Sequence, residues 1–287
     1  MKRFNVFDGA FNITMVCNLT CDGCESFNNY NFKGHLKYAD YAHYYKEWSK
    51  KISVDIVTIH GGEPFTNPDI VNWGVNLKQL WPTAEEYYVA TNGTMLKIKS
   101  EAAKKLIELG YYLNVCVHDP AMYDDIRDQL EFVLQDYAYH MVPNDIGIQY
   151  IDFETNERLA ILETTYHFKK SAIDYIKDKT WYMHRSNEED AYDVCLENNN
   201  PCNFFHKGLL YQCQLTALKE DLFLQFSIEP EAVDLLKKYK HGDPFMSAKE
   251  LKRFFGNHNK PIPQCTLCPG CNDTHPIYPM SKKKITF

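Results

Sequence analysis

Three cysteines stand close together near the N-terminus, in the pattern Cys17-x3-Cys21-x2-Cys24. Three thiolates can bind three corners of a [4Fe–4S] cluster and leave the fourth iron open for a cofactor. The alternative is half of a zinc site, but structural zinc takes four closed ligands and no fourth ligand stands nearby in the sequence. The spacing therefore favours an open iron–sulfur cluster over zinc.

A second set of four cysteines lies in the C-terminal part, as Cys195-x12-Gly208-x4-Cys213 followed after a gap by Cys265-x2-Cys268. Four thiolates close a tetrahedral site, which suits either zinc or a fully ligated [4Fe–4S] cluster. We expect a metal at this set. Iron–sulfur is favoured over zinc because of the cysteine loop near the N-terminus.

A glycine-rich loop, Gly61-Gly62-Glu63-Pro64, follows a β-branched run at 54–59. A CxxxCxxC loop after a first strand and a Gly-Gly-Glu-Pro loop after the second together resemble the radical S-adenosylmethionine (SAM) superfamily. The resemblance implies that Cys17, Cys21 and Cys24 bind the cluster and that SAM chelates the open iron through its amine and carboxylate. It also implies that one electron cleaves the sulfonium to give a 5′-deoxyadenosyl radical, chemistry that the cofactor carries and the protein positions.

The resemblance assigns roles to the glycine-rich loop. In such a site Gly61 and Gly62 let the backbone approach the ligand, and Glu63 can pair with the methionyl ammonium. A plain turn is the alternative interpretation of the loop.

Two further segments match the family less specifically. Thr91-Asn92-Gly93 resembles the family's common Thr-Asn-Gly, which places Asn92 beside the cofactor. Cys116 stands where many members carry a serine near the cofactor, and a buried structural cysteine is the alternative. Members usually have an aromatic residue before the third cysteine, where this chain has Gly23, so adenine packing is expected to differ there.

The second cysteine set resembles the twitch domain, a shortened SPASM extension in which a Cys…Gly-x4-Cys hairpin and a CxxC pair hold one auxiliary cluster. Cys195 fits this spacing, whereas Cys202 stands too close to Gly208. Cys202 and Cys271 remain without an assigned ligand role. Each is an inert buried thiol, a replacement ligand or a hydrogen-atom donor.

Auxiliary clusters in twitch enzymes commonly accept an electron from a substrate radical or bind substrate, so the resemblance implies a two-electron, dehydrogenase-like oxidation. The substrate would be a small polar metabolite such as a sugar, cyclitol or nucleotide. An external electron donor, flavodoxin or ferredoxin, is implied by the chemistry.

Three alternatives stay open. A radical epimerase would use a thiol such as Cys202 or Cys271 to return a hydrogen. A peptide-modifying maturase is a further alternative, although the first strand begins near residue 10 and leaves no room for a leader-binding domain. From another class comes a non-catalytic zinc-binding module built on the same cysteines.

A scaffold of βα units must position these motifs. From about residue 10 to 155, β-rich runs alternate with helical ones, with candidate strands at 11–15, 54–59, 86–90, 111–117 and 146–153 and candidate helices between them. Parallel strands place their loops at one carboxyl edge, where such folds have their active sites. We expect an α/β fold, a partial (β/α)6 TIM-like barrel over residues 1–185, with a twitch domain over residues 186–287.

Composition limits the other classes of function. Hydrophobic residues make up 45% and charged residues 24% of 287, as in a folded protein, and the net charge of −7 argues against nonspecific duplex nucleic-acid binding. There is no secretory signal and no apolar run long enough for a membrane span, so we expect a cytoplasmic protein. In that reducing compartment 10 cysteines are metal ligands or catalytic thiols rather than disulfides.

Overall fold

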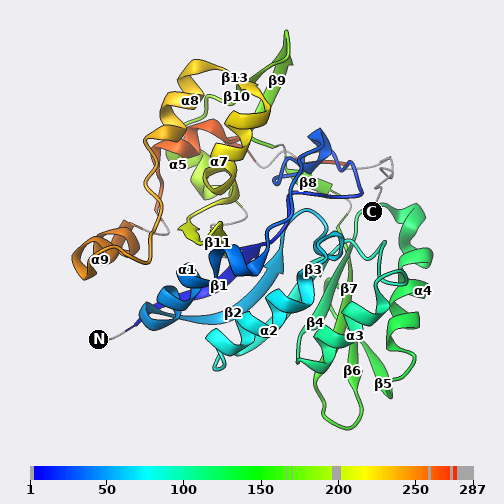
Figure 1. Cartoon of the computed structure of the whole chain (residues 1–287). Helices are drawn as coiled ribbons and strands as arrows, with labels where there is room; N and C mark the ends of the chain where they lie inside the picture. The colour runs from blue at the N-terminus through cyan, green and yellow to red at the C-terminus, as the bar shows by residue number, and fades with distance from the viewer. Residues whose placement is uncertain are drawn as a thin grey trace.

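The computed structural model describes residues 3–165, 167–169, 171–195, 202–257, 260–271 and 274–276. Its main feature is a nine-stranded sheet (Figure 1). In sheet order the strands are β12 (Leu209–Tyr211), β11 (Cys202–His206), β1 (Phe4–Asn12), β2 (Ile52–His60), β3 (Glu86–Thr91), β4 (Tyr112–Val117), β7 (Arg158–Thr164), β6 (Gly147–Asp152) and β5 (Tyr139–Pro143). The six strands from β11 to β7 run parallel, and an antiparallel strand or hairpin flanks them at each end. The expected α/β class, with a large and mostly parallel sheet, is confirmed.

Four helices connect the parallel strands and form one core with them: α1 (Tyr38–Lys51), α2 (Ile70–Leu80), α3 (Ser100–Glu108) and α4 (Tyr123–Leu134). Helix α1 shows why these segments are helical. Tyr38, Tyr45 and Trp48 recur at helical spacing, and all three are buried against the sheet. The helix thus buries one face and leaves the other to solvent.

The first strand begins earlier than the sequence suggested, at Phe4 rather than near residue 11. The start of the strand was missed because it contains polar residues, which form hydrogen bonds to residues of β2. Asn5 donates to Asp55 at 2.7 Å, and Thr58 donates to Asp8 at 2.7 Å. Residues 13–16 leave the strand and lead into the cysteine loop.

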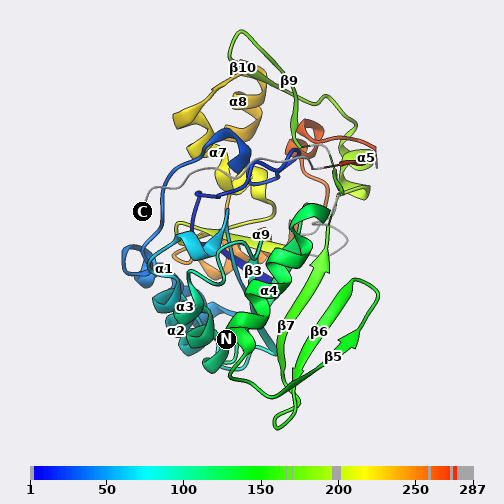
Figure 2. The same cartoon turned by 90° about the vertical axis from the view of Figure 1, so that its right-hand side faces the viewer.

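The last part of the predicted βα pattern was wrong. The expected strand at 146–153 is β6, which is antiparallel and forms a hairpin with β5. The next parallel strand is β7, which pairs with β4. Strand β7 was missed because the β5–β6 hairpin lies between α4 and β7 and breaks the alternation of strands and helices. Figure 2 shows this hairpin at the end of the molecule opposite α8.

A C-terminal group lies above the sheet in Figures 1 and 2. It contains helices α5 (Glu188–Asp193), α7 (Gln214–Gln225) and α8 (Pro230–Lys237), a small sheet of β9 (Ile173–Lys177), β10 (Thr180–Met183) and β13 (Ser227–Ile228), and the 3₁₀ helix η4 (Pro263–Leu267). Trp181 stacks on Phe226 at 4.0 Å in a second core, which Phe27 joins from the N-terminal part. Helix α9 (Ala248–Asn257) packs on the first core, and β8 (His167–Lys169) pairs with β14 (Thr274–Pro276).

The main sheet includes residues from both sides of the expected boundary near 185. Strand β11 lies beyond that position, yet it pairs in parallel with β1, with Cys202 opposite Asp8. Phe205 of β11 is fully buried and stacks on Phe11 of β1 at 4.5 Å. Within the described residues, no helix has the length and apolar character needed to cross a bilayer.

The turn between β11 and β12 depends on Gly208. This residue has a φ of +81°, which favours glycine, and its carbonyl accepts a hydrogen bond from the Trp48 indole at 3.0 Å. A Cβ atom placed here would lie 2.5 Å from the Tyr44 ring. The hairpin therefore approaches α1 too closely for any side chain at this position.

We expect Gly208→Ala to lower the free energy of unfolding by about 1–3 kcal/mol, because the variant combines left-handed strain with a clash. Chemical denaturation of the full chain measures this. Gly256→Ala is the matched control, because Gly256 lies in α9 with no heavy atom within 4 Å of its added Cβ. Alanine should be neutral or stabilising there by up to about 1 kcal/mol, and equal effects of the two variants would contradict the prediction.

Candidate functional site

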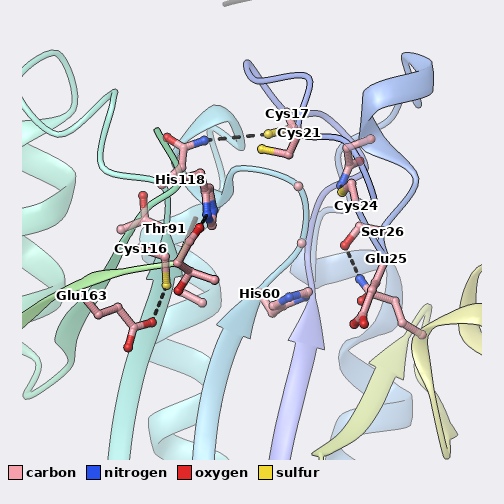
Figure 3. Close-up of a pocket in the computed structure, with 17 residues that line it drawn as sticks. Cys17, Cys21, Cys24, Glu25, Ser26, His60, Thr91, Cys116, His118 and Glu163 are labelled. Carbon is pink, nitrogen blue, oxygen red and sulfur yellow. Dashed lines mark hydrogen bonds between the residues drawn. The ribbon is translucent and has the colours of Figure 1, made fainter. Parts of the chain in front are cut away.

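A cavity of about 360 Å³ opens at the carboxyl ends of the central parallel strands (Figure 3). Its lining comes from the loops after β1 and β2, the ends of β3, β4 and β7, and the first residue of α7. This is the edge at which the sequence predicted the motifs to meet. The size is within the range of small-molecule and cofactor sites.

All three cysteines of the N-terminal motif line this cavity. The Cys17 sulfur accepts hydrogen bonds from the backbone N–H of Leu19 at 3.5 Å and from the Asn92 amide at 3.8 Å. The Cys24 sulfur accepts one from the Asn28 amide at 4.0 Å, and burial raises the pKa of this thiol. Three thiols that line one cavity, two of them with N–H donors on their sulfurs, are a soft donor set that fits a [4Fe–4S] cluster.

The glycine-rich loop packs directly on the cysteine loop. The Gly62 N–H donates to the Thr14 carbonyl at 2.9 Å, and the Glu63 N–H donates to the Val16 carbonyl at 2.8 Å. A Cβ at Gly62 would lie 2.3 Å from that Val16 carbonyl oxygen. Both glycines line the cavity, as expected, but this contact gives Gly62 a reason beyond ligand access: a side chain would push the cysteine loop away.

Glu63 does not line the cavity, although the sequence suggested that it pairs with a ligand ammonium. Its side chain is fully buried, and both carboxylate oxygens accept protein hydrogen bonds. One oxygen accepts from the Phe65 N–H at 3.1 Å and the Thr91 hydroxyl at 2.8 Å, and the other accepts from the Asn92 N–H at 2.8 Å. Glu63 therefore holds the loops after β2 and β3 together. Burial raises its pKa to about 7.

Asn92 connects the loop after β3 to the cysteine loop. Besides Cys17, its amide nitrogen reaches the Asn18 side-chain oxygen at 2.9 Å. Its own side-chain oxygen accepts from the Thr94 hydroxyl at 2.6 Å. The expected cavity position of Asn92 is therefore combined with a structural role.

Cys116 lines the cavity, and the structure adds a partner that sequence reasoning missed. Its thiol donates to the Glu163 carboxylate at 2.6 Å, and the Asn114 amide donates to the same oxygen at 3.4 Å. Burial raises the pKa of Cys116 well above its ordinary value, and the charge of Glu163 adds to this. Glu163 could not be predicted as a neighbour because it lies on β7, the strand that the sequence pattern missed.

Two half-buried histidines, His60 and His118, also line the cavity. Burial lowers the pKa of His60 to about 4 and lowers that of His118. Both imidazoles are therefore neutral at physiological pH. Within the described part of the chain the His60 Nδ1 atom has no hydrogen-bond partner. The one sequence feature that could have identified His60 as a cavity residue is its place immediately before Gly61.

The four cysteines of the second set lie in or beside α5, α7 and η4 of the C-terminal group. Cys195 follows α5. Just before this helix, the Ser186 N–H donates to the carbonyl of Thr266 in η4, the segment that carries Cys265. Cys213 caps α7 and packs with Cys268 against the second core. Gln214, next to Cys213, lines the cavity and donates to the Ser26 hydroxyl, so this region adjoins the cavity.

The two unassigned cysteines lie elsewhere. Cys271 is exposed and is not among the cavity residues, and Cys202 lies on β11 with its side chain outside the described residues. In the described ranges no group of three or more Cys, His, Asp or Glu side chains has the arrangement of a site for a single metal ion.

Comparison with known proteins gives one family. Residues 11–195 match the model described as the Radical SAM superfamily. A search of curated proteins gives no match.

A search of solved structures gives several matches of low identity. BtrN in complex with AdoMet and 2-DOIA is 23% identical over 44% of this chain and 52% of its own, with a TM-score of 0.36, so the match spans about half of BtrN. An open conformation of BtrN is 14% identical over 92% of both chains, with a TM-score of 0.46. Streptococcus suis SuiB bound to S-adenosylmethionine is 18% identical over 46% of this chain and 38% of its own, with a TM-score of 0.30.

Titration of Glu63 should appear in the stability of the protein. Its pKa is raised from 4.5 to about 7 in the folded state, so its contribution is fully present below about pH 4.5 and is lost as pH rises through 7. We expect the free energy of unfolding of wild type, relative to Glu63→Gln, to fall by up to about 3 kcal/mol between those pH values. Denaturant titrations at several pH values measure this.

The exposed Glu231 of α8 provides the matched control. Glu231→Gln should follow the wild-type pH profile. A Glu63→Gln profile that also runs parallel to wild type would contradict the assignment.

Proposed function

The chain belongs to the radical SAM superfamily, and we propose that it reductively cleaves S-adenosylmethionine and removes a hydrogen atom from a bound substrate. The observation that carries this proposal is that Cys17, Cys21 and Cys24 line one cavity together with the loops after β2 and β3. When bound, the cluster supplies one electron and SAM supplies the 5′-deoxyadenosyl radical.

The chain's own residues hold and orient these groups. Cys17, Cys21 and Cys24 would bind three irons, and Gly61 and Gly62 would present backbone to SAM. Asn92 would contact both SAM and a cluster ligand, because it lines the cavity and donates to the Cys17 sulfur. Glu63 contributes by fixing the loops. The pairing of Glu63 with the methionyl ammonium, which the family resemblance implies, stays a prediction.

We propose a two-electron oxidation of a small polar metabolite such as a sugar, cyclitol or nucleotide. The cavity volume suits a small molecule, and beyond the cysteines the lining is polar, with His60, His118, Glu163 and Gln214. Oxidation of an alcohol carbon removes a hydrogen atom, a proton and an electron. Glu163 is a carboxylate available to the proton.

The remaining electron needs an acceptor, and we propose an auxiliary [4Fe–4S] cluster on Cys195, Cys213, Cys265 and Cys268. The contact of Gln214 with both the cavity and this region supports an acceptor close to the substrate. Residues 186–287 would then be a twitch domain beside a partial (β/α)6 barrel, with β11 and β12 extending its sheet.

Two conditions accompany this reaction. Open-site clusters need an external reductant, so we propose flavodoxin or ferredoxin as the electron donor. A reducing cytoplasm is the compartment in which ten thiols would serve as ligands rather than disulfides.

A second candidate reaction is a radical epimerisation, in which a thiol returns a hydrogen to the substrate. The specific observation in its favour is the protonated Cys116 thiol on the cavity. Neither Cys202 nor Cys271, the donors expected from the sequence, has a described side chain there.

Metal content tests the proposal. Anaerobically reconstituted protein should be brown, contain about eight irons per chain, four for each cluster, and form 5′-deoxyadenosine from SAM with dithionite. Cys17→Ser should lose about half of the iron and all of this activity, because it removes a ligand of the open cluster. Cys265→Ser should lose a similar amount of iron through the other set.

Cys271→Ser is the matched control and should keep the wild-type iron content, because Cys271 is exposed and lies away from the cavity. A colourless protein that binds zinc and leaves SAM intact would refute the proposed enzyme and favour a zinc-binding module.

A further inference from the structure

Cys116 and Glu163 form a matched pair across two neighbouring strands. They are direct partners in the parallel register of β4 and β7, and both side chains line the cavity. Figure 3 shows the Cys116 sulfur directed at the Glu163 carboxylate at the end of these strands. The pair is therefore part of the cavity wall and is fixed by the sheet.

The surroundings keep this thiol in its S–H form. The Glu163 oxygen at 2.6 Å accepts the thiol hydrogen, and the Asn114 amide lies near both members of the pair, 3.9 Å from the sulfur and 3.4 Å from that oxygen. Burial and the nearby carboxylate both disfavour a thiolate. An S–H group can give up a hydrogen atom, whereas a thiolate cannot.

Cys116 differs in its proposed role from the other cysteines that line the cavity. Among the described cavity residues, the remaining cysteines are those of the ligand loop, Cys17, Cys21 and Cys24. A cluster ligand has no hydrogen to donate.

We propose that the Cys116 thiol is the hydrogen-atom donor of this cavity, with Glu163 as its positioning residue. The S–H bond breaks, a C–H bond forms on a carbon radical held in the cavity, and a thiyl radical remains on sulfur. One electron from the external iron–sulfur or flavin protein and one proton passed by Glu163 restore the thiol. This inference rests on the proposed cleavage of SAM, and it applies to the epimerisation named above, because the oxidation returns no hydrogen to the substrate.

Deuterium transfer tests the proposal without a known substrate. The reconstituted full chain is incubated anaerobically with SAM and dithionite in heavy water, where the thiol exchanges to S–D. The deuterium fraction of each 5′-deoxyadenosine molecule is then read by mass spectrometry. We expect wild type to place deuterium on the 5′ carbon, and Cys116→Ser to lose most of it because an O–D bond is too strong to donate.

The matched control is Cys271→Ser, which should keep the wild-type deuterium fraction because Cys271 lies off the cavity. An unchanged fraction in Cys116→Ser overturns the assignment while leaving SAM cleavage intact. Formation of no 5′-deoxyadenosine by wild type instead overturns the proposed function, and the donor role falls with it.

A second measurement needs neither cluster nor SAM. In the infrared spectrum of the apo full chain, the Cys116 S–H stretch should lie at low frequency because of its short hydrogen bond. Cys116→Ser should remove this band, and Glu163→Ala should move it to higher frequency, while Cys271→Ser leaves it in place. A band that does not respond to Glu163→Ala overturns the pairing on which the proposal depends.

Discussion

The buried carboxylate of Glu63 is the constraint on which the site depends. Burying a carboxylate is costly unless donors surround it, and here two backbone N–H groups and one hydroxyl do so. These donors belong to the loop after β2 and to the end of β3 with the loop that follows it, so one side chain fixes the two loops relative to each other. The Glu63 N–H in turn binds the Val16 carbonyl next to Cys17, which extends the constraint to the cysteine loop. The three motifs thus form one connected structure.

Burial of the lining residues determines the charges in the cavity. Burial keeps His60 and His118 neutral and keeps Cys116 protonated, so the lining offers hydrogen-bonding groups with few charges. Glu25 and Glu163 are the exceptions, and one oxygen of Glu163 is engaged by Cys116 and Asn114.

Local patterns in the sequence predicted the loops after β1 to β3 and the strands β2 to β4, because each motif directly follows a hydrophobic run. Glu163 escaped prediction since its role depends on β7 lying beside β4, a pairing that the β5–β6 hairpin conceals. Cys202 and Phe205 raised the same difficulty, because β11 pairs with β1 from almost two hundred residues away. Glu63 shows a third limit. Its residue type suggested a ligand contact, and only the packing revealed that its oxygens are used within the protein.

The place of β11 in the sheet has a consequence for how the chain folds. Phe205 is stacked on Phe11 in the first core, so the first strand lacks one neighbour until the ribosome has released most of the polypeptide. Closing a loop of this length is slow, and the exposed edge of β1 is a site for misassociation in the meantime. The region matched by the family model ends at residue 195, before β11 begins. A fragment cut at that point would expose an aromatic surface, and chaperones would be expected to hold it.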